Sequence, residues 1–381
     1  MRAADGVSPF RYRAEQSALD DLKKRLAATR WPDRQTVEGW TQGPPLEVLQ
    51  EFVDTWRNDY DWRVCEKRLN SYPQYRTRID GVAIHFLHIR SVHAAALPIL
   101  LTHGWPGSFL EFLGSVDSLV NPTAHGGTSA DSFHVVIPSL PGHGFSDHPR
   151  QPGWTVDKIA DAWVELMQRL GYNRYVAQGG DWGAMITTRM AQKRAGGLAA
   201  IHLNYPPVFP DPLPGDPAPE ERKAIQEWQE FKQLQMGYYQ MQSTQPQTVG
   251  YALTDSPVGQ AGWMLGKFHD WTDHPESQLS ALSTEQILDE TTLYWLTNTA
   301  TSSARMYFDN KGGDPCLGRV DLPVGCSIFP KEKPKMQKRW AEACYPKLIH
   351  WREVEHGGHF AAFEQPALFV REMRDCFRAV R

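Results

Sequence analysis

A glycine-rich turn between a strand and a helix constrains the fold of this 381-residue chain more than any other feature. Residues 175–178 form a short apolar run typical of a buried strand, and a helical pattern starts at Ala184. Between them stands Gly179-Gly180-Asp181-Trp182-Gly183. The glycines let the chain turn sharply and let the helix approach the strand closely. This pattern is typical of a nucleophile elbow, with Asp181 at the position of the nucleophile.

Short apolar runs and helical patterns alternate along the chain from residue 99 onward. Runs of this length are typical of strands buried on both faces, and we expect them at residues 99–102, 134–138, 175–178, 199–203, 324–329 and 348–354. One intervening helix is predicted to begin after Thr155, its N-cap, and to end at Gly171. This order predicts an α/β protein with a mostly parallel sheet covered by helices.

Two other segments depart from this alternation. Residues 1–95 are predicted to form an N-terminal extension with helices and a β-hairpin, whose turn is Asp80-Gly81. Residues 206–219 hold seven prolines, and a long helical pattern follows them. We therefore expect a helical lid over residues 206–308, inserted into a catalytic domain made of residues 96–205 and 309–381. A lid there would cover the carboxyl ends of the strands, where α/β proteins place their sites.

Charge and apolar content restrict the partners. Forty Lys and Arg against 44 Asp and Glu give a net charge of −4, which argues against a nucleic-acid-binding surface. The longest apolar run is residues 94–101, whereas a membrane-spanning helix needs about 20 residues. The N-terminus also lacks the apolar core of a signal peptide, so a cytoplasmic protein is expected.

The five cysteines, an odd number without a C-x-x-C pair, are predicted to be reduced and mostly buried.

A second motif, His103-Gly104-Trp105-Pro106-Gly107, follows the predicted strand at residues 99–102. In α/β-hydrolases the loop after this strand supplies one backbone N–H of an oxyanion hole, and the residue after the nucleophile supplies the other. In this chain the two donors would be the backbone amides of Trp105 and Trp182.

A candidate general base lies in the loop after residues 348–354. His359 stands deeper in that loop than His356, next to apolar residues, and is preferred as the base. The H-x-x-H spacing of the two histidines has no accompanying Cys or carboxylate signature, so no metal is expected.

A candidate acid to orient this base follows residues 324–329. Glu332 is preferred there, with Asp314 and Asp321 as alternatives. The order Asp181, Glu332, His359 then matches the nucleophile–acid–base order of α/β-hydrolases.

An aspartate nucleophile restricts the substrate. A carboxylate is ionised at neutral pH and can attack saturated carbon without a base, which gives an ester. Water activated by His359 could hydrolyse that ester, while the two backbone amides stabilise the oxyanion. Epoxides and alkyl halides are the leading substrates with a leaving group on saturated carbon. An epoxide oxygen needs a proton donor such as tyrosine, whereas a halide needs only weak donors such as indole N–H groups.

These motifs resemble those of the microsomal-type epoxide hydrolases of the α/β-hydrolase fold, over nearly the whole chain. Thr29-Arg30-Trp31-Pro32 and Ile79-Asp80-Gly81 resemble the N-terminal region of that family. Gly237-Tyr238, Thr248-Val249-Gly250 and Asp255-Ser256-Pro257-Val258-Gly259 resemble its cap. The resemblance implies that water converts a small, largely apolar epoxide to a vicinal diol through an ester on Asp181, without a cofactor. It also implies that Tyr238 and Tyr307 open the ring, with Tyr239 as a neighbour easily mistaken for the first.

Two other functions stay open on the same residues. One is a haloalkane dehalogenase-like hydrolase with the same Asp181 nucleophile, and the other is a non-catalytic ligand-binding protein on a hydrolase fold. Membrane-bound members of the family carry an N-terminal anchor, whereas this chain begins almost at the soluble region, so no membrane anchor is expected. A homodimer is possible, and detoxification and secondary metabolism both fit such an enzyme.

Overall fold

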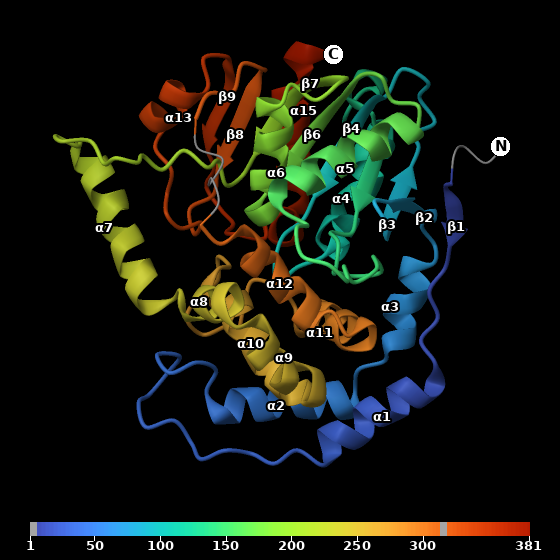
Figure 1. Cartoon of the computed structure of the whole chain (residues 1–381), viewed down its shortest axis with the longest axis vertical. Helices are drawn as coiled ribbons and strands as arrows, with labels where there is room; N and C mark the ends of the chain where they lie inside the picture. The colour runs from blue at the N-terminus through green and yellow to red at the C-terminus, as the bar shows by residue number, and fades with distance from the viewer. Residues whose placement is uncertain (1–5, 313–317) are drawn as a thin grey trace.

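A nine-stranded sheet organises the protein, and a computed structural model describes residues 6–312 and 318–381 (Figure 1). The strand order is β1-β2-β3-β5-β4-β6-β7-β8-β9. Strands β4 to β9 are parallel, and β1, β2 and β3 add an antiparallel edge. The strands are β1 (Ser8–Phe10), β2 (Gln74–Ile79), β3 (Val82–Ile89), β4 (Leu97–Thr102), β5 (Phe133–Pro138), β6 (Tyr175–Gly179), β7 (Leu198–Leu203), β8 (Val324–Ile328) and β9 (Leu348–Glu353).

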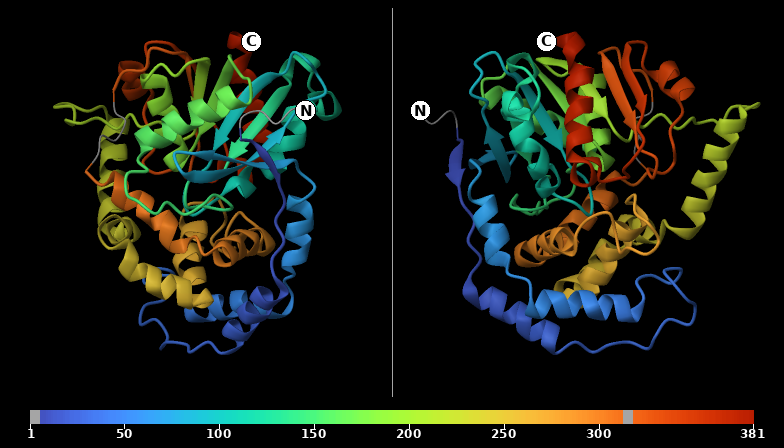
Figure 2. Two further views of the ribbon diagram at one scale, coloured as in Figure 1. Left: turned by 45° about the vertical axis from the view of Figure 1, so that its right-hand side comes forward. Right: turned by 180° about the vertical axis from the view of Figure 1, so that it is seen from behind.

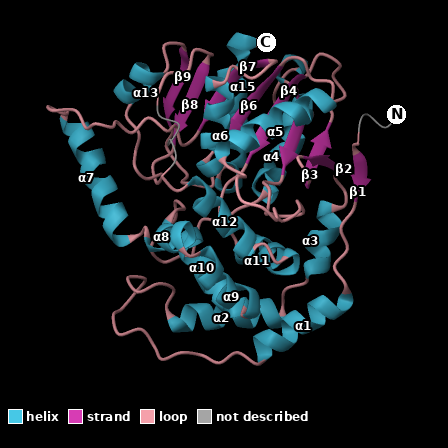
Figure 3. Cartoon of the chain, viewed as in Figure 1, coloured by secondary structure: helices cyan, strands magenta, loops and turns pink. Residues whose placement is uncertain are grey.

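Helices cover the sheet and fill the part of the molecule below it in Figure 3. The α-helices are α1 (Gln16–Ala27), α2 (Leu46–Asn58), α3 (Trp62–Leu69), α4 (Leu113–Val120), α5 (Val156–Arg169), α6 (Asp181–Gln192), α7 (Pro219–Leu234), α8 (Gly237–Thr244), α9 (Pro246–Asp255), α10 (Pro257–Asp270), α11 (Thr284–Thr297), α12 (Ala300–Asn310), α13 (Lys338–Cys344), α14 (Ala361–Glu364) and α15 (Pro366–Phe377). Short 3-10 turns are Phe109–Phe112, Pro122–His125, Ser129–Asp131 and Arg378–Val380.

The structure confirms the predicted α/β class and mostly parallel sheet. All six predicted core strands are present, with ends that differ by at most two residues. The helix after the elbow begins at Asp181 rather than at Ala184. Strand β1 and helix α3 are not predicted from the sequence. Strand β1 has only three residues and joins the sheet edge through its backbone, so it leaves no periodic signal.

Two apolar layers hold the sheet between helices. On one face α5 and α6 bury side chains such as Trp163 and Met190 against the sheet. On the other face α4 and α15 do the same with Val116 and Phe369. The helix α5 begins and ends as predicted, since the Thr155 hydroxyl accepts from the Lys158 amide and Gly171 follows with a φ of +80°. These two layers hold in place the carboxyl ends of the strands, after which the candidate site residues follow.

Six helices, α7 to α12, lie between β7 and β8 in the sequence and beyond one end of the sheet in space (Figure 2). The extension closes this region from the far side, because α1 and α2 pack against α10. Trp56 of α2 is buried there, and its indole Nε1 donates to the Thr292 hydroxyl of α11 at 2.8 Å. A third apolar cluster thus joins extension, lid and the Trp105 loop.

Three further observations bear on the predictions from composition. Within residues 6–312 and 318–381, no helix is long and apolar enough to cross a membrane. Cys65, Cys326, Cys344 and Cys376 are free thiols, three of them buried, whereas Cys316 lies outside the described residues. In the same described ranges, no group of three or more His, Cys, Asp or Glu side chains is arranged to hold a metal ion.

Candidate active site

The elbow holds Asp181 in a strained backbone conformation at the start of α6. Its φ is +50°, in the left-handed region that non-glycine residues rarely adopt. The crossing of α6 over the sheet is so close that a Cβ on Gly183 would lie 2.0 Å from the carbonyl oxygen of Thr102. Strain of this kind persists only where the surrounding structure enforces it, and it projects the Asp181 carboxylate beyond the strand end.

The loop after β4 brings a backbone donor to this carboxylate. The Trp105 amide donates to Asp181 Oδ1 at 2.9 Å. A Cβ on Gly104 would lie 2.1 Å from the same oxygen, so glycine is needed for this approach. The structure thus places one of the two predicted oxyanion donors on Asp181, and the role of the Trp182 amide stays a prediction.

His359 bridges Asp181 and Glu332. Its Nε2 lies 3.3 Å from Asp181 Oδ2, and its Nδ1 lies 3.0 Å from both carboxylate oxygens of Glu332. Burial alone would lower the pKa of His359, but the Glu332 charge and the bond to Asp181 outweigh it and hold that pKa well above its usual range. The three groups therefore form a connected acid–base relay in chain order.

The alternative site residues lie elsewhere. Asp321 pairs with Arg194 and Arg319 at the surface, and Asp314 lies outside the described residues. His356 is exposed, whereas His359 is largely covered. Among the described candidates, the structure places Glu332 and His359 beside Asp181.

The two tyrosines singled out by the resemblance come from separate lid helices and line the same cavity as Asp181. Tyr238 of α8 stacks on Trp105 with ring centroids 5.1 Å apart, and Tyr307 of α12 packs edge-on against Trp182 at 4.9 Å. Their own ring centroids are 6.0 Å apart. Burial and then neighbouring charge, that of Asp181 included, raise the pKa of both phenols well above the usual value, which keeps them protonated.

Tyr239 differs from Tyr238 in its electrostatic surroundings. Burial alone raises the pKa of Tyr239, with no contribution from Asp181. Its ring lies 5.5 Å from Tyr307. Of the two adjacent tyrosines, Tyr238 is therefore the one whose pKa the Asp181 charge helps to raise.

A cavity of about 570 Å³ opens in front of these groups. Its wall is mainly aromatic and apolar, including Tyr205, Phe209, Trp228, Phe231, Trp271 and Met336. Asp181, Glu332, His359 and both tyrosines also line it. Such a pocket fits a small, mostly apolar ligand whose polar atom faces the nucleophile.

A second, very small cavity of about 10 Å³ lies behind the nucleophile. Asp181, His359 and Glu111 line it, and its size is near that of a single water molecule. Burial and then the Glu290 charge raise the pKa of Glu111 well above its usual range. The sequence analysis missed Glu111, although a lone acid inside the apolar run Phe109-Leu110-Glu111-Phe112-Leu113 is a readable signal of a buried polar site.

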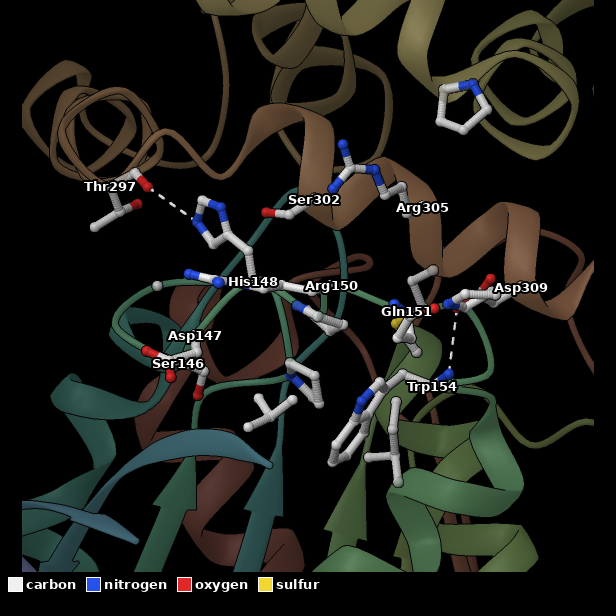
Figure 4. Close-up of a pocket in the computed structure, with 18 of the residues that line it drawn as sticks. Ser146, Asp147, His148, Arg150, Gln151, Trp154, Thr297, Ser302, Arg305 and Asp309 are labelled. Atoms are coloured by element: carbon white, nitrogen blue, oxygen red, sulfur yellow. Dashed lines mark hydrogen bonds between the residues drawn. The ribbon is translucent and has the colours of Figure 1, made fainter. Parts of the chain in front are cut away.

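A larger cavity, of about 1730 Å³, lies away from these residues. It is an open groove between the loop at residues 146–154 and α12, with Arg150 and Arg305 on its two sides (Figure 4). Asp309 closes one end by accepting from the backbone amide of Trp154 at 3.2 Å. Asp181, Glu332, His359, Tyr238 and Tyr307 all line the smaller aromatic cavity and none of them lines this groove, so the aromatic cavity is the candidate active site.

Trp271 is a further site residue that sequence patterns did not reveal. Its ring centroid lies 4.9 Å from that of His359 and 5.3 Å from that of Tyr238. Its carbonyl oxygen accepts from the His359 amide at 2.8 Å. Trp271 stands about 90 residues before His359, and only the folded lid brings the two together.

Comparisons with known proteins agree with this arrangement. Residues 7–112 match the family described as "Epoxide hydrolase N terminus", and residues 98–219 match the "alpha/beta hydrolase fold" family. A curated protein of Stigmatella aurantiaca (strain DW4/3-1), whose name assigns it provisionally to the epoxide hydrolases, is 58% identical over 99% of this chain and 86% of its own length. Epoxide hydrolase 1 of Sus scrofa is 34% identical over 97% of this chain and 88% of its own length.

A solved structure extends the likeness to three dimensions. The structure of Aspergillus niger epoxide hydrolase superposes with a TM-score of 0.89 at 30% identity, over 100% of this chain and 98% of that one. The fold, the extension and the lid are therefore shared with proteins of that name.

Proposed function

Because the chain belongs to the epoxide hydrolase family and is a hydrolase that acts on epoxides, we propose that it forms a vicinal diol through an ester on Asp181. The observation that carries the proposal is the position of the Asp181 carboxylate. It lies between the Trp105 amide and His359 and faces Tyr238 and Tyr307 across an aromatic cavity.

In the first step Asp181 Oδ2 attacks one epoxide carbon. A new C–O ester bond forms as the C–O bond of the ring breaks, and Tyr238 or Tyr307 gives its phenol proton to the ring oxygen. Both phenols are protonated before attack, in keeping with their raised pKa. The tyrosinate then recovers a proton from the His359 imidazolium. That transfer becomes favourable because esterification removes the Asp181 charge that had helped to raise the pKa of His359.

In the second step neutral His359 accepts a proton from water, and the water oxygen attacks the Asp181 carbonyl carbon. The oxyanion develops on Oδ1, where the Trp105 amide already donates. Glu332 stabilises the imidazolium that results. The intermediate then breaks its bond to the alcohol, which leaves as the diol with the proton of the new Asp181 carboxyl group. Asp181 returns to its ionised state and His359 stays protonated, as at the start.

Each segment of the chain has its own role in the proposed reaction. Residues 96–205 and 309–381 carry the nucleophile, acid and base, residues 206–308 supply the tyrosines and the cavity wall, and residues 1–95 hold the lid in place. Two phenols over the nucleophile suit an epoxide oxygen, which needs a proton, better than a halide, which needs none. A cytoplasmic location and dimerisation stay predictions, which cell fractionation and the mass in solution would test.

A single turnover in ¹⁸O-labelled water tests the proposal. With enzyme in excess over styrene oxide, the label should enter the Asp181 carboxylate, and the first diol molecule should contain none. Enzyme kept in labelled water without epoxide is the control and should take up no label at Asp181. Label found in the first diol, with none in Asp181, would show direct attack by water and overturn the ester mechanism.

A further inference from the structure

The loop that carries His359 is tied to a lid segment, residues 271–273, which follows α10. The His359 amide donates to the Trp271 carbonyl oxygen at 2.8 Å. The Gly357 amide donates to the Asp273 carboxylate at 2.9 Å. A Cβ on Gly358 would lie 2.3 Å from the Trp271 carbonyl oxygen, so the two segments are in direct backbone contact.

The Glu364 carboxylate also joins the lid segment to the His359 loop. Glu364, the last residue of α14, accepts from the Phe360 amide through Oε1 at 3.0 Å. Through Oε2 it accepts from the Asp273 amide at 2.8 Å. Phe360 follows His359 directly, so a single side chain fixes the distance between the lid segment and the residue next to the base.

Only a side chain with two acceptor oxygens, such as a carboxylate, can accept from both backbone amides in this way. Two separate N–H donors point at two separate oxygens, and an amide side chain has only one oxygen to offer. Burial raises the pKa of Glu364 to about 7, whereas the two backbone donors and the His359 charge lower it. Each of its two oxygens therefore accepts from a different backbone segment.

We propose that Glu364 is a positioning residue that locks lid residues 271–273 to the His359 loop, so that water activation depends on a docked lid. The inference rests on the proposed function, because it concerns only the second, base-dependent step. Formation of the Asp181 ester needs the carboxylate and the tyrosines, whereas hydrolysis also needs His359 held between Asp181 and Glu332. A displacement of about 1 Å is enough to slow such a step about 100-fold.

In Glu364→Gln, the rates of formation and of hydrolysis of the Asp181 ester can be measured separately with styrene oxide. Rapid quenching followed by mass spectrometry measures how fast the ester forms and how fast it decays. We expect ester formation within about threefold of wild type and hydrolysis slowed about 10- to 100-fold, so that the ester accumulates at steady state and KM falls together with kcat. Asp273→Ala, which removes the bond to the Gly357 amide, should show the same split.

Two controls make the result decisive. Glu355→Gln changes an exposed carboxylate in the same loop and should leave both steps unchanged. His359→Gln should accumulate the Asp181 ester, and its failure to do so would count against the proposed function rather than against Glu364. If Glu364→Gln and Asp273→Ala slow both steps equally, or leave hydrolysis at the wild-type rate, the positioning role is wrong.

Discussion

At the scale of single residues, neighbouring charge decides what burial does to a histidine. His103 and His143 are buried near the same strand ends, and burial lowers the pKa of His103 to about 4 and that of His143 to about 3. His359 is also largely covered, yet its pKa is raised because Glu332 and Asp181 flank the ring. Burial thus favours the neutral form of the two core histidines, whereas the flanking carboxylates favour the protonated form of His359, in keeping with the proposed proton transfer.

The tyrosine pair gives the first prediction. Tyr238→Phe and Tyr307→Phe each remove one proton donor, so ring opening should slow by about 10²-fold or more. The loss should be seen in the rate of ester formation by rapid quenching. Tyr239→Phe removes a phenol that Asp181 does not influence and should cost much less. An equal loss in Tyr239→Phe and Tyr238→Phe would contradict the assignment.

Glu290 gives a prediction for stability against pH. Burial raises its pKa from 4.5 to about 8, although the Ser108 hydroxyl donates to it at 3.0 Å. Between these two pH values the folded protein keeps the proton that the unfolded chain loses, so this group makes the free energy of unfolding fall as pH rises.

The isosteric change Glu290→Gln tests that sign. The variant should gain stability relative to wild type as pH rises from about 4.5 to about 8, as measured by urea unfolding at several pH values. Glu285→Gln, at an exposed position of the same helix, is the matched control. A difference between Glu290→Gln and wild type that does not change with pH would refute the argument.

At the scale of elements, the elbow depends on how closely α6 crosses β4. Gly183→Ala would push a methyl group into the Thr102 carbonyl, so we expect a loss of about 1–3 kcal/mol in the free energy of unfolding. Gly266→Ala in α10, where the nearest atom is 3.8 Å away, should instead stabilise the protein by up to about 1 kcal/mol. Urea unfolding measures both, and similar behaviour of the two variants would contradict the close-approach argument.

The sequence predicts elements well where a local pattern carries them. Strands β4 to β8 are short and mostly buried, and the helix after Thr155 has an N-cap and a terminating glycine, so a local pattern predicts each of them. Strand β9, at the sheet edge, has no buried residue. Motif order likewise predicts Asp181, Glu332 and His359 as neighbours, and the structure brings them together. Trp271 could not be predicted in this way, because its contact with His359 is set by the docking of a distant lid segment rather than by any local spacing.

At the scale of the whole molecule, the lid is held between two layers that lie far apart in the sequence. The sheet end with the Trp105 loop packs against one side and the extension against the other. Tyr60 and Arg68 of the extension both bind Asp289 of α11, at 2.7 and 2.8 Å. The extension is therefore part of the structure that positions the tyrosines, although none of its side chains lines the active-site cavity.

Trp56 tests this long-range support. Trp56→Ala should lower the free energy of unfolding by about 3–5 kcal/mol, because it empties a buried site between extension and lid. Thr292→Val removes only the hydrogen-bond partner of the Trp56 indole and should cost about 1–3 kcal/mol. If Trp56→Ala cost less than Thr292→Val in denaturant unfolding, the extension would not be the support that the packing indicates.

The central claim is that Asp181 carries the substrate as an ester that His359 then hydrolyses. The most direct measurement is the intact mass of His359→Gln after incubation with styrene oxide, followed by peptide mapping. The ester mechanism predicts a stable gain of one substrate mass on the peptide that contains Asp181, and no such gain in Asp181→Ala. Steady diol production by His359→Gln without any adduct, or an adduct on another residue, would contradict it.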